Sequence, residues 1–261
     1  MVKILLVDIE SAPALVYVWK FFQENVSPKQ VVEHPFIMSI AAKWLDSDDI
    51  FYYENRTSND KALIVAINKL LDEADIVVAH NGNRFDFPKI RARSVIHGLK
   101  PPSPYKMIDT YRISKKEFNF PSNSLEYLCK ALDLPVKKGD HKKFSGFNLW
   151  LECLRKNDEA WKELKDYNIL DVYALEALYL RLRPWATNHP NVVIYKEAGP
   201  APLENDPQCI KCGSTSTQWR GYAFTATGQF HRYQCNDCGG WSRTRYMLNS
   251  KNEALLGNCI S

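Results

Sequence analysis

Two Cys-x-x-Cys pairs near the C-terminus constrain the fold of this chain more than any other feature of its sequence. The pairs are Cys209 with Cys212 and Cys235 with Cys238, and each is followed directly by a glycine. Four thiolates at this spacing suit one tetrahedral structural Zn²⁺, and a glycine supplies the backbone angle that such a turn needs. The sequence therefore predicts a small domain whose folding depends largely on a bound zinc ion.

A proline-rich segment separates this small domain from the rest of the chain. Residues 184–207 contain five prolines, which lack an amide hydrogen and fix the backbone angle φ, so regular structure should stop there. One apolar run inside the segment, residues 192–195, could still form a strand. We expect two domains, at residues 1–200 and 201–261, the second being a linker and a domain that resembles a zinc ribbon.

The composition is that of a folded protein of the cytoplasm. Hydrophobic residues make up 45% of the chain and charged residues 25%, which are ordinary values for a globular protein. An odd number of cysteines, seven, argues against a secreted disulfide scaffold. No apolar run approaches the length of about 18 residues that crosses a bilayer, and the N-terminus becomes acidic too soon for a signal peptide. We expect no association with a membrane.

The net charge of +4 lies entirely in the C-terminal segment. Residues 1–206 contain equal numbers of basic and acidic side chains, whereas residues 207–261 contain six basic and two acidic ones. Arginines and aromatic residues are interleaved there, which suits phosphate contact and base stacking on nucleic acid. We expect Arg220 and Arg243 to contact nucleic acid. The alternatives, a merely solvated surface and aromatic residues that form the domain's own core, remain open.

The longer domain has the pattern of an α/β protein. Apolar runs predict strands at residues 3–9, 36–44, 50–53, 75–79 and 106–109. Helical spacing predicts helices at residues 59–73, 86–97, 122–132, 145–156 and 158–183. We expect Ser58 or Asn59 to cap the first helix, and Ser122 or Ser124 the third. Three strands followed by alternating helices and strands predict a mixed sheet flanked by helices.

Carboxylates lie at the end of the first predicted strand. Asp8 and Glu10 follow the apolar run at residues 4–7. Because alternate side chains of a strand point to the same side, both carboxylates share one face of the sheet. Two carboxylates this close repel each other and are costly to bury without a cation between them. The pair favours a metal site over a strand that has simply reached solvent.

Two more acids lie on predicted helices. Asp86 is near the start of a helix that follows a buried strand, where it could equally be an ordinary acid favoured by the helix dipole. Tyr167 and Asp171 are four residues apart on one face of the last long helix, within its apolar stripe. A carboxylate in an apolar stripe needs a partner, which is either a metal ion or a basic side chain.

Together these residues resemble a known signature. Asp8-Ile9-Glu10, Asn81-x-x-x-Phe85-Asp86 and Tyr167-x-x-x-Asp171 are similar to the three motifs of the DEDD exonucleases, in the tyrosine-containing (DEDDy) branch. Over about residues 1–183 the chain resembles DnaQ-like proofreading domains and the exonuclease domains of family B DNA polymerases. The histidine branch has a histidine five residues before the last acid, where this chain has Asp166. The resemblance implies a ribonuclease H-like fold with a five-stranded mixed sheet.

The resemblance also implies an activity, a 3′–5′ exonuclease that releases nucleoside 5′-monophosphates from DNA. The four acids would hold two Mg²⁺ or Mn²⁺ ions, since carboxylate oxygens without His or Cys select such cations. Tyr167 would position the attacking water. We expect nucleic-acid contacts close to the ions and in a lysine-rich loop, at Ser11, Asn81, Phe85, Lys138, Lys142 and Lys143.

Two other functions remain compatible with the sequence. The chain could be a nuclease-like adaptor whose zinc ribbon binds a replication or repair protein, although the complete set of four acids argues against a dead nuclease. It could also be an exonuclease that acts on RNA or on branched DNA.

Overall fold

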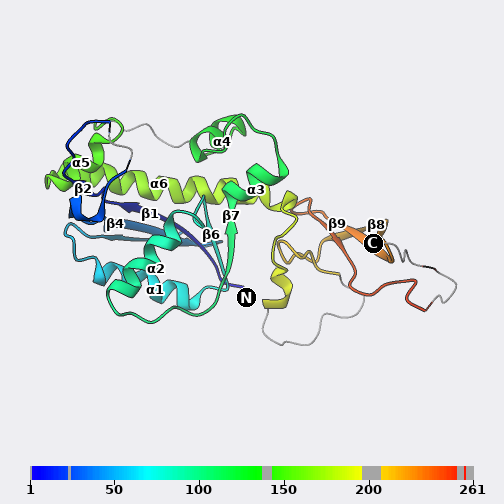
Figure 1. The fold of residues 1–261 in the computed structure, drawn as a ribbon. Helices are drawn as coiled ribbons and strands as arrows, with labels where there is room; N and C mark the ends of the chain where they lie inside the picture. Colours follow the sequence, from blue (N-terminus) through cyan, green and yellow to red (C-terminus); the bar gives the residue numbers. More distant parts are fainter. Residues whose placement is uncertain (1, 23–24, 137–142, 196–206, 252–255, 257–261) are drawn as a thin grey trace. The chain divides into compact units, whose positions relative to one another are not determined.

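The computed structural model describes residues 2–22, 25–136, 143–195, 207–251 and 256 (Figure 1). The chain divides into two compact units, Lys3–Leu180 and Arg181–Ser261. The domain boundary that we expect at residue 200 falls in a segment outside the described residues, so it stays a prediction. None of the described helices is both long enough and apolar enough to cross a membrane.

The larger unit is built on a mixed five-stranded sheet. In the order of the sheet, its strands are β5 (Ile50–Glu54), β4 (Ile37–Trp44), β1 (Ile4–Ser11), β6 (Ile76–Ala79) and β7 (Lys106–Asp109). The central strand β1 is antiparallel to β4 and parallel to β6. β5 is antiparallel to β4, and β7 is parallel to β6. The mixed sheet predicted from the sequence is confirmed.

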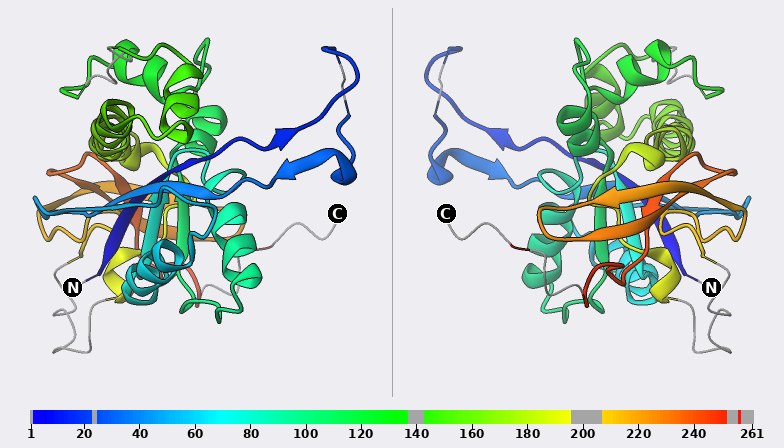
Figure 2. Two further views of the ribbon diagram at one scale, coloured as in Figure 1. Left: turned by 90° about the vertical axis from the view of Figure 1, so that its left-hand side faces the viewer. Right: turned by 90° about the vertical axis from the view of Figure 1, so that its right-hand side faces the viewer.

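Helices cover both faces of this sheet (Figures 1 and 2). On one face lie α1 (Lys61–Glu73) and α2 (Asp86–Ile96), which pack on alternate side chains of β1 in a buried core. On the other face lie α5 (Asn148–Leu154) and the long helix α6 (Asp158–Leu182), which pack on Met38 and its neighbours. The helix α4 (Leu125–Ala131) is capped by Ser124, one of the two predicted caps, whose side chain accepts from the Tyr127 N–H. The short helix α3 (Thr110–Glu117) was not predicted.

A hairpin connects β1 to β4 and extends beyond the sheet (Figure 2). It consists of the short strands β2 (Leu15–Val16) and β3 (Val31–Glu33) and a 3₁₀ turn, η1 (Pro28–Gln30). The hairpin was not predicted either, because its strands are too short to show an alternating pattern.

Two local predictions are wrong. The cap of α1 is Asp60, not Ser58 or Asn59, and Asp60 does not bond the helix N–H groups through its side chain. Its buried carboxylate instead accepts from the Ile37 N–H at 2.9 Å and from Arg93 at 2.7–2.9 Å. The run Val192–Tyr195 is a 3₁₀ turn, η3, rather than a strand. There the side chain of Asn191 accepts from the Val193 N–H and its carbonyl accepts from the Ile194 N–H, which turns the chain.

The smaller unit contains a three-stranded antiparallel sheet. Its strands are β8 (Thr217–Phe224), β9 (Gln229–Cys235) and β10 (Trp241–Arg243), with β9 in the middle. Before them lie the 3₁₀ turns η2 (Arg183–Trp185) and η3. Phe230 is the large aromatic side chain that the sheet buries, at 5% exposure, whereas Trp219, Phe224 and Tyr246 are exposed.

Candidate active site

The central strand presents two carboxylates to the long helix. Leu5, Val7 and Ile9 point into the core formed with α1 and α2, so Asp8 and Glu10, at alternate positions, point to the opposite face. That is the face covered by α6 (Figure 1). The shared orientation expected for these two acids is therefore present.

Helix α6 brings a third carboxylate to the same place. One oxygen each of Asp8, Glu10 and Asp171 lies within 4.8 Å of the other two, and Asp171 is buried. Three carboxylates this close repel one another unless a cation or protons neutralise them. The donor set consists of oxygen alone, which fits Mg²⁺ or Mn²⁺.

Asn168 connects this group to the sheet, and its role was missed from the sequence. Its side-chain N–H donates to Asp8 Oδ2 at 2.7 Å, while its Oδ1 accepts from Ser39 Oγ at 2.9 Å. Asn168 is fully buried, so both bonds are made away from water. The available signal was a polar side chain within the apolar stripe of α6, three residues before Asp171. This amide fixes the orientation of the Asp8 carboxylate.

Asp86 lies against the same strand but is not one of the three clustered acids. It is the first residue of α2, and its Oδ1 accepts from the Ile9 N–H, between Asp8 and Glu10, at 3.2 Å. Burial raises the pKa of Asp86 to about 7, although the Ile9 N–H and the charge of Lys89 act in the opposite direction. Asp86 therefore accepts a hydrogen bond from the backbone that carries Asp8 and Glu10. Its raised pKa means that its carboxyl group is protonated at a higher pH than an exposed aspartate.

Trp150, on α5, is a second residue that was missed. Its indole N–H donates to Glu10 Oε2 at 2.9 Å. The same ring makes an edge contact with Tyr167, with centroids 6.2 Å apart and planes at 82°. Trp150 thus orients Glu10 and packs beside the tyrosine of the third motif. Sequence spacing alone gives no sign of this, because the three residues lie on different elements.

Lys89 is a third residue that was missed. Its Nζ donates to Ser11 Oγ at 2.6 Å and lies 3.9 Å from the centre of the Phe85 ring. Burial lowers the pKa of Lys89, and the charges of Asp86 and Glu10 act against that lowering. Ser11 and Phe85, both predicted to touch nucleic acid, therefore surround one cation close to the acids.

The loop that leads to Asp86 is held by another carboxylate. Asp109 is buried and accepts from the N–H groups of Asn81 at 2.8 Å and Asn83 at 3.2 Å. It also caps α3. Asn81 has a positive φ of 61°, a conformation that asparagine tolerates better than most residues. A nucleic-acid contact by Asn81 remains a prediction.

The lysine-rich loop is described only in part. Lys138 and Lys142 lie outside the described residues. Lys143 is exposed and pairs with Glu159, and its backbone N–H donates to Glu163. Its predicted contact with nucleic acid is untested.

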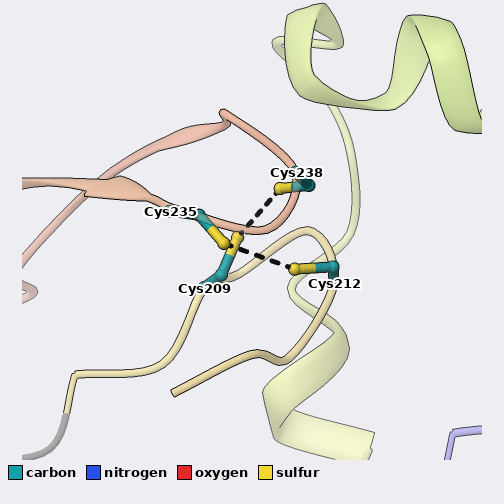
Figure 3. A group of neighbouring side chains, drawn as sticks. All are labelled: Cys209, Cys212, Cys235 and Cys238. Atoms are coloured by element: carbon teal, nitrogen blue, oxygen red, sulfur yellow. Dashed lines mark hydrogen bonds between the residues drawn. The ribbon is translucent and has the colours of Figure 1, made fainter. Parts of the chain in front are cut away.

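The four predicted zinc ligands converge in the smaller unit (Figure 3). All four sulfur atoms lie within 4.8 Å of one another, and the Cys209–Cys238 and Cys212–Cys235 pairs are 3.6 Å apart. In a tetrahedral zinc site with Zn–S bonds of about 2.3 Å, neighbouring sulfurs are about 3.8 Å apart. The cysteines are free thiols, and their spacing fits zinc.

The turns that hold the cysteines are formed as expected. Gly213 and Gly239 have φ angles of 78° and 74°, and their N–H groups donate to the carbonyls of Cys209 and Cys235 at 2.8 and 3.0 Å. Such angles favour glycine. A metal site with four cysteine ligands is therefore compatible with both backbone and side chains.

The arginines of the smaller unit differ in their surroundings. The Arg243 guanidinium carbon lies 3.8 Å from the centre of the Phe230 ring. The Arg220 carbonyl accepts from the side chain of Arg232, at 2.9 and 3.0 Å, and Arg220 itself is exposed. Their contact with nucleic acid remains a prediction.

The sheet order and the acids on its central strand define a ribonuclease H-like fold. A family model of the RNase_H superfamily matches residues 32–183, and the chain belongs to this superfamily. The fold supports a nuclease as the class of enzyme. The comparison with curated proteins found no match.

One solved structure similar to this chain is the family B DNA polymerase from the hyperthermophilic archaeon Pyrobaculum calidifontis. The identity is 14% and the TM-score is 0.49. The match covers 71% of this chain and 26% of the polymerase, so this chain spans about a quarter of that protein's length.

Proposed function

We propose that this chain is a divalent-metal-dependent 3′–5′ exonuclease that releases nucleoside 5′-monophosphates from DNA. The observation that carries the proposal is the group formed by Asp8, Glu10 and Asp171, whose oxygens lie within 4.8 Å of one another. Membership of the RNase_H superfamily supports a nuclease. The direction of cleavage and the product follow from the resemblance of the three motifs to the DEDDy branch.

Asp8, Glu10, Asp86 and Asp171 would hold two Mg²⁺ or Mn²⁺ ions, which would supply a water nucleophile at neutral pH and stabilise charge on the phosphate. The chain's own groups orient these acids. Asn168 donates to Asp8 at 2.7 Å. Because an amide carries no charge, it fixes the carboxylate without competing with a cation.

Tyr167 and Trp150 would act beside Glu10. The Tyr167 hydroxyl would hold the attacking water and direct it toward the terminal phosphate. The edge contact with Trp150, at 6.2 Å between ring centroids, limits rotation of the tyrosine ring. Since Trp150 also donates to Glu10 at 2.9 Å, one side chain would fix the positions of the acid and the tyrosine relative to each other.

The smaller unit would hold one structural Zn²⁺ at its four cysteines and assist nucleic-acid binding. Two observations support this role. Arg220 is exposed, as are the aromatic side chains of Trp219, Phe224 and Tyr246. Exposed arginine and aromatic groups in one small domain suit a flexible nucleic-acid strand, because phosphate contact and base stacking do not require a particular sequence.

The proposal is tested by incubating the protein with 5′-labelled single-stranded DNA, double-stranded DNA and RNA, each with Mg²⁺, Mn²⁺ or EDTA. We expect products that shorten stepwise from the 3′ end of DNA and nucleoside 5′-monophosphate as the released species. EDTA should stop the reaction. Shortening from the 5′ end, or internal cuts alone, would contradict the assigned direction, and no cleavage with either metal would favour the adaptor.

A further inference from the structure

The hairpin between β1 and β4 concentrates apolar side chains on the surface. Among the described residues, 23 large hydrophobic side chains are exposed, and eight of these lie between Leu15 and Val32. Trp19, Phe21 and Phe22 are 96%, 101% and 98% exposed. Single exposed apolar side chains are common, but such a concentration within one hairpin is typical of a binding surface.

Part of this surface is hollowed. Tyr17, Val18 and Trp19 on one arm of the hairpin, and Lys29, Gln30, Val31 and Val32 on the other, line a hollow of about 500 Å³. The two arms are tied together, since the Tyr17 N–H donates to the Gln30 carbonyl at 2.9 Å and the Gln30 side chain donates to the Tyr17 carbonyl at 3.0 Å. The backbone of the arm that carries Tyr17 is therefore held against the other arm before any ligand binds.

The hairpin is continuous with the strands that carry the acids. Ser11 of β1 pairs with Ile37 of β4, and the Ala12 N–H donates to the Phe36 carbonyl at 2.9 Å, so the same two strands lead into its arms. Tyr17 is seven residues beyond Glu10, at most about 23 Å away along an extended chain. A single strand of several nucleotides spans such a distance.

We propose that this hollow binds an unpaired base of the nucleic-acid strand whose 3′ end lies at the acids. Tyr17 and Trp19 offer ring faces on which any base can stack, and Lys29 is the charged side chain among the described residues that line the hollow. The aromatic rings would stack on the base, and the Lys29 ammonium group would contact its phosphate. The inference rests on the proposed nuclease function and adds a substrate contact remote from the reacting phosphate.

The test compares a long and a minimal substrate. The long one is a single-stranded DNA of about 20 nucleotides, longer than most sites for a single strand. The minimal one is the p-nitrophenyl ester of thymidine 5′-monophosphate, which is too short to reach the hairpin. The variants are Trp19→Ala, Trp19→Phe and, as a matched control, Phe22→Ala, since Phe22 is equally exposed but does not line the hollow.

We expect Trp19→Ala to raise KM for the oligonucleotide by roughly 5- to 150-fold, the value of one stacked base, with kcat unchanged. KM and kcat for the ester should be unchanged, and Trp19→Phe should retain most of the oligonucleotide affinity because it keeps a ring. An unchanged KM in Trp19→Ala, or an equal loss in Phe22→Ala, would overturn the proposal. Equal losses on both substrates would also overturn it, because they would indicate a structural effect.

Two further measurements separate this inference from the proposed function and from a protein partner. Fluorescence anisotropy of the labelled oligonucleotide, in buffer without divalent ions, measures binding whether or not the protein cleaves. Weaker binding by Trp19→Ala supports the hollow even if the wild type has no activity. Light scattering reports the oligomeric state, and a wild-type dimer that Trp19→Ala converts to a monomer would assign the surface to a second copy of this chain.

Discussion

The group of acids and the group of cysteines both bring possible metal ligands within 4.8 Å of one another, but they are assembled in different ways. Asp8 and Asp171 belong to the central strand and the last long helix of the larger unit, and the buried core on both faces of the sheet positions them. The four cysteines belong to two short turns, each closed by two backbone hydrogen bonds, one of which is donated by a glycine N–H. The fold of the larger unit positions the acids, whereas we expect the fold of the smaller unit to depend on a metal ion bound at its cysteines.

This difference has a chemical consequence. A metal site within a preformed core can leave coordination positions for water and substrate, because the surrounding sheet and helices keep the acids in place. Four thiolates saturate a tetrahedral ion and leave no such position. The acids are therefore suited to catalysis and the cysteines to structure.

The largest expected effect comes from removing one acid. Asp171→Asn should lower the rate of DNA cleavage by at least about 10³-fold, since metal-ion stabilisation of the transition state is worth several kcal/mol. Folding should be retained, because the core on both faces of the sheet does not need the ion. The measurements are the initial rate at saturating Mg²⁺ and the circular dichroism spectrum. Asp166→Asn, an exposed position on the same helix, should keep full activity. Substantial activity in Asp171→Asn would remove this residue from the site.

Removing one cysteine should unfold the smaller unit and leave the chemistry at the acids intact, the reverse of the pattern expected for Asp171→Asn. Cys235→Ser should abolish zinc binding and unfold the smaller unit, because the binding energy of a structural zinc is also its folding energy. Cleavage of the p-nitrophenyl ester should change little. Zinc content is measured by atomic absorption and folding by protease sensitivity. Cys129→Ala, at a buried cysteine outside the cluster, should keep one zinc ion per chain. If Cys235→Ser kept its zinc, the proposed ligand set would be wrong.

The two sites should also respond to pH with opposite sign. Burial raises the pKa of Asp86 from its usual 3.8 to about 7, so in the metal-free protein the native state holds a proton that the unfolded state releases. Between about pH 4 and pH 7 the free energy of unfolding of the larger unit should therefore fall as pH rises, by at most about 4 kcal/mol. Urea titrations at several pH values without divalent ions measure this slope, which Asp86→Asn should flatten.

At the cysteines, zinc affinity should instead fall as pH decreases, because the thiolates are protonated. A zinc-binding titration over the same range of pH provides the comparison. The contrast would be contradicted if the free energy of unfolding of the larger unit rose with pH, or if the zinc affinity of the smaller unit fell with rising pH.

The smallest effect concerns the indole that orients Glu10. Trp150→Phe keeps a ring beside Tyr167 but removes the N–H that donates to Glu10 at 2.9 Å. We expect a loss of about 10-fold in kcat, the value of one hydrogen bond to a charged group. Trp161→Phe provides a control, since its indole N–H donates to the Cys153 carbonyl in the core. Equal activity losses in the two variants would indicate a packing effect rather than orientation of Glu10.

The sequence predicts best those features that depend on spacing along one element. Alternation on a strand places Asp8 and Glu10 on one face, and a four-residue spacing places Tyr167 beside Asp171 on one helix. The Cys-x-x-Cys turns are equally local. The strands can also be recognised locally, because a buried strand such as β6 consists almost entirely of β-branched residues. The order of these strands and of the helices between them then predicts the mixed sheet.

What the sequence did not predict depends on partners that are distant along the chain. Asn168 matters because Ser39 and Asp8 lie opposite it, and Trp150 matters because Glu10 does. Val192–Tyr195 has the composition of a strand, but Asn191 turns it into a 3₁₀ helix. The hairpin was not predicted because its strands are too short to show an alternating pattern, and its exposed apolar side chains add no pattern of a buried face.

The bond between Asn168 and Asp8 joins residues that are 160 positions apart, and this separation has a consequence during synthesis. At a translation rate of about 5–20 residues per second, α6 follows β1 by roughly 8–32 s. Until α6 is made, Asp8 and Glu10 lack their partners from it, and the face of β1 that it covers stays open to chaperones. The nascent chain is therefore expected to remain inactive toward nucleic acid until its last long helix has been synthesised.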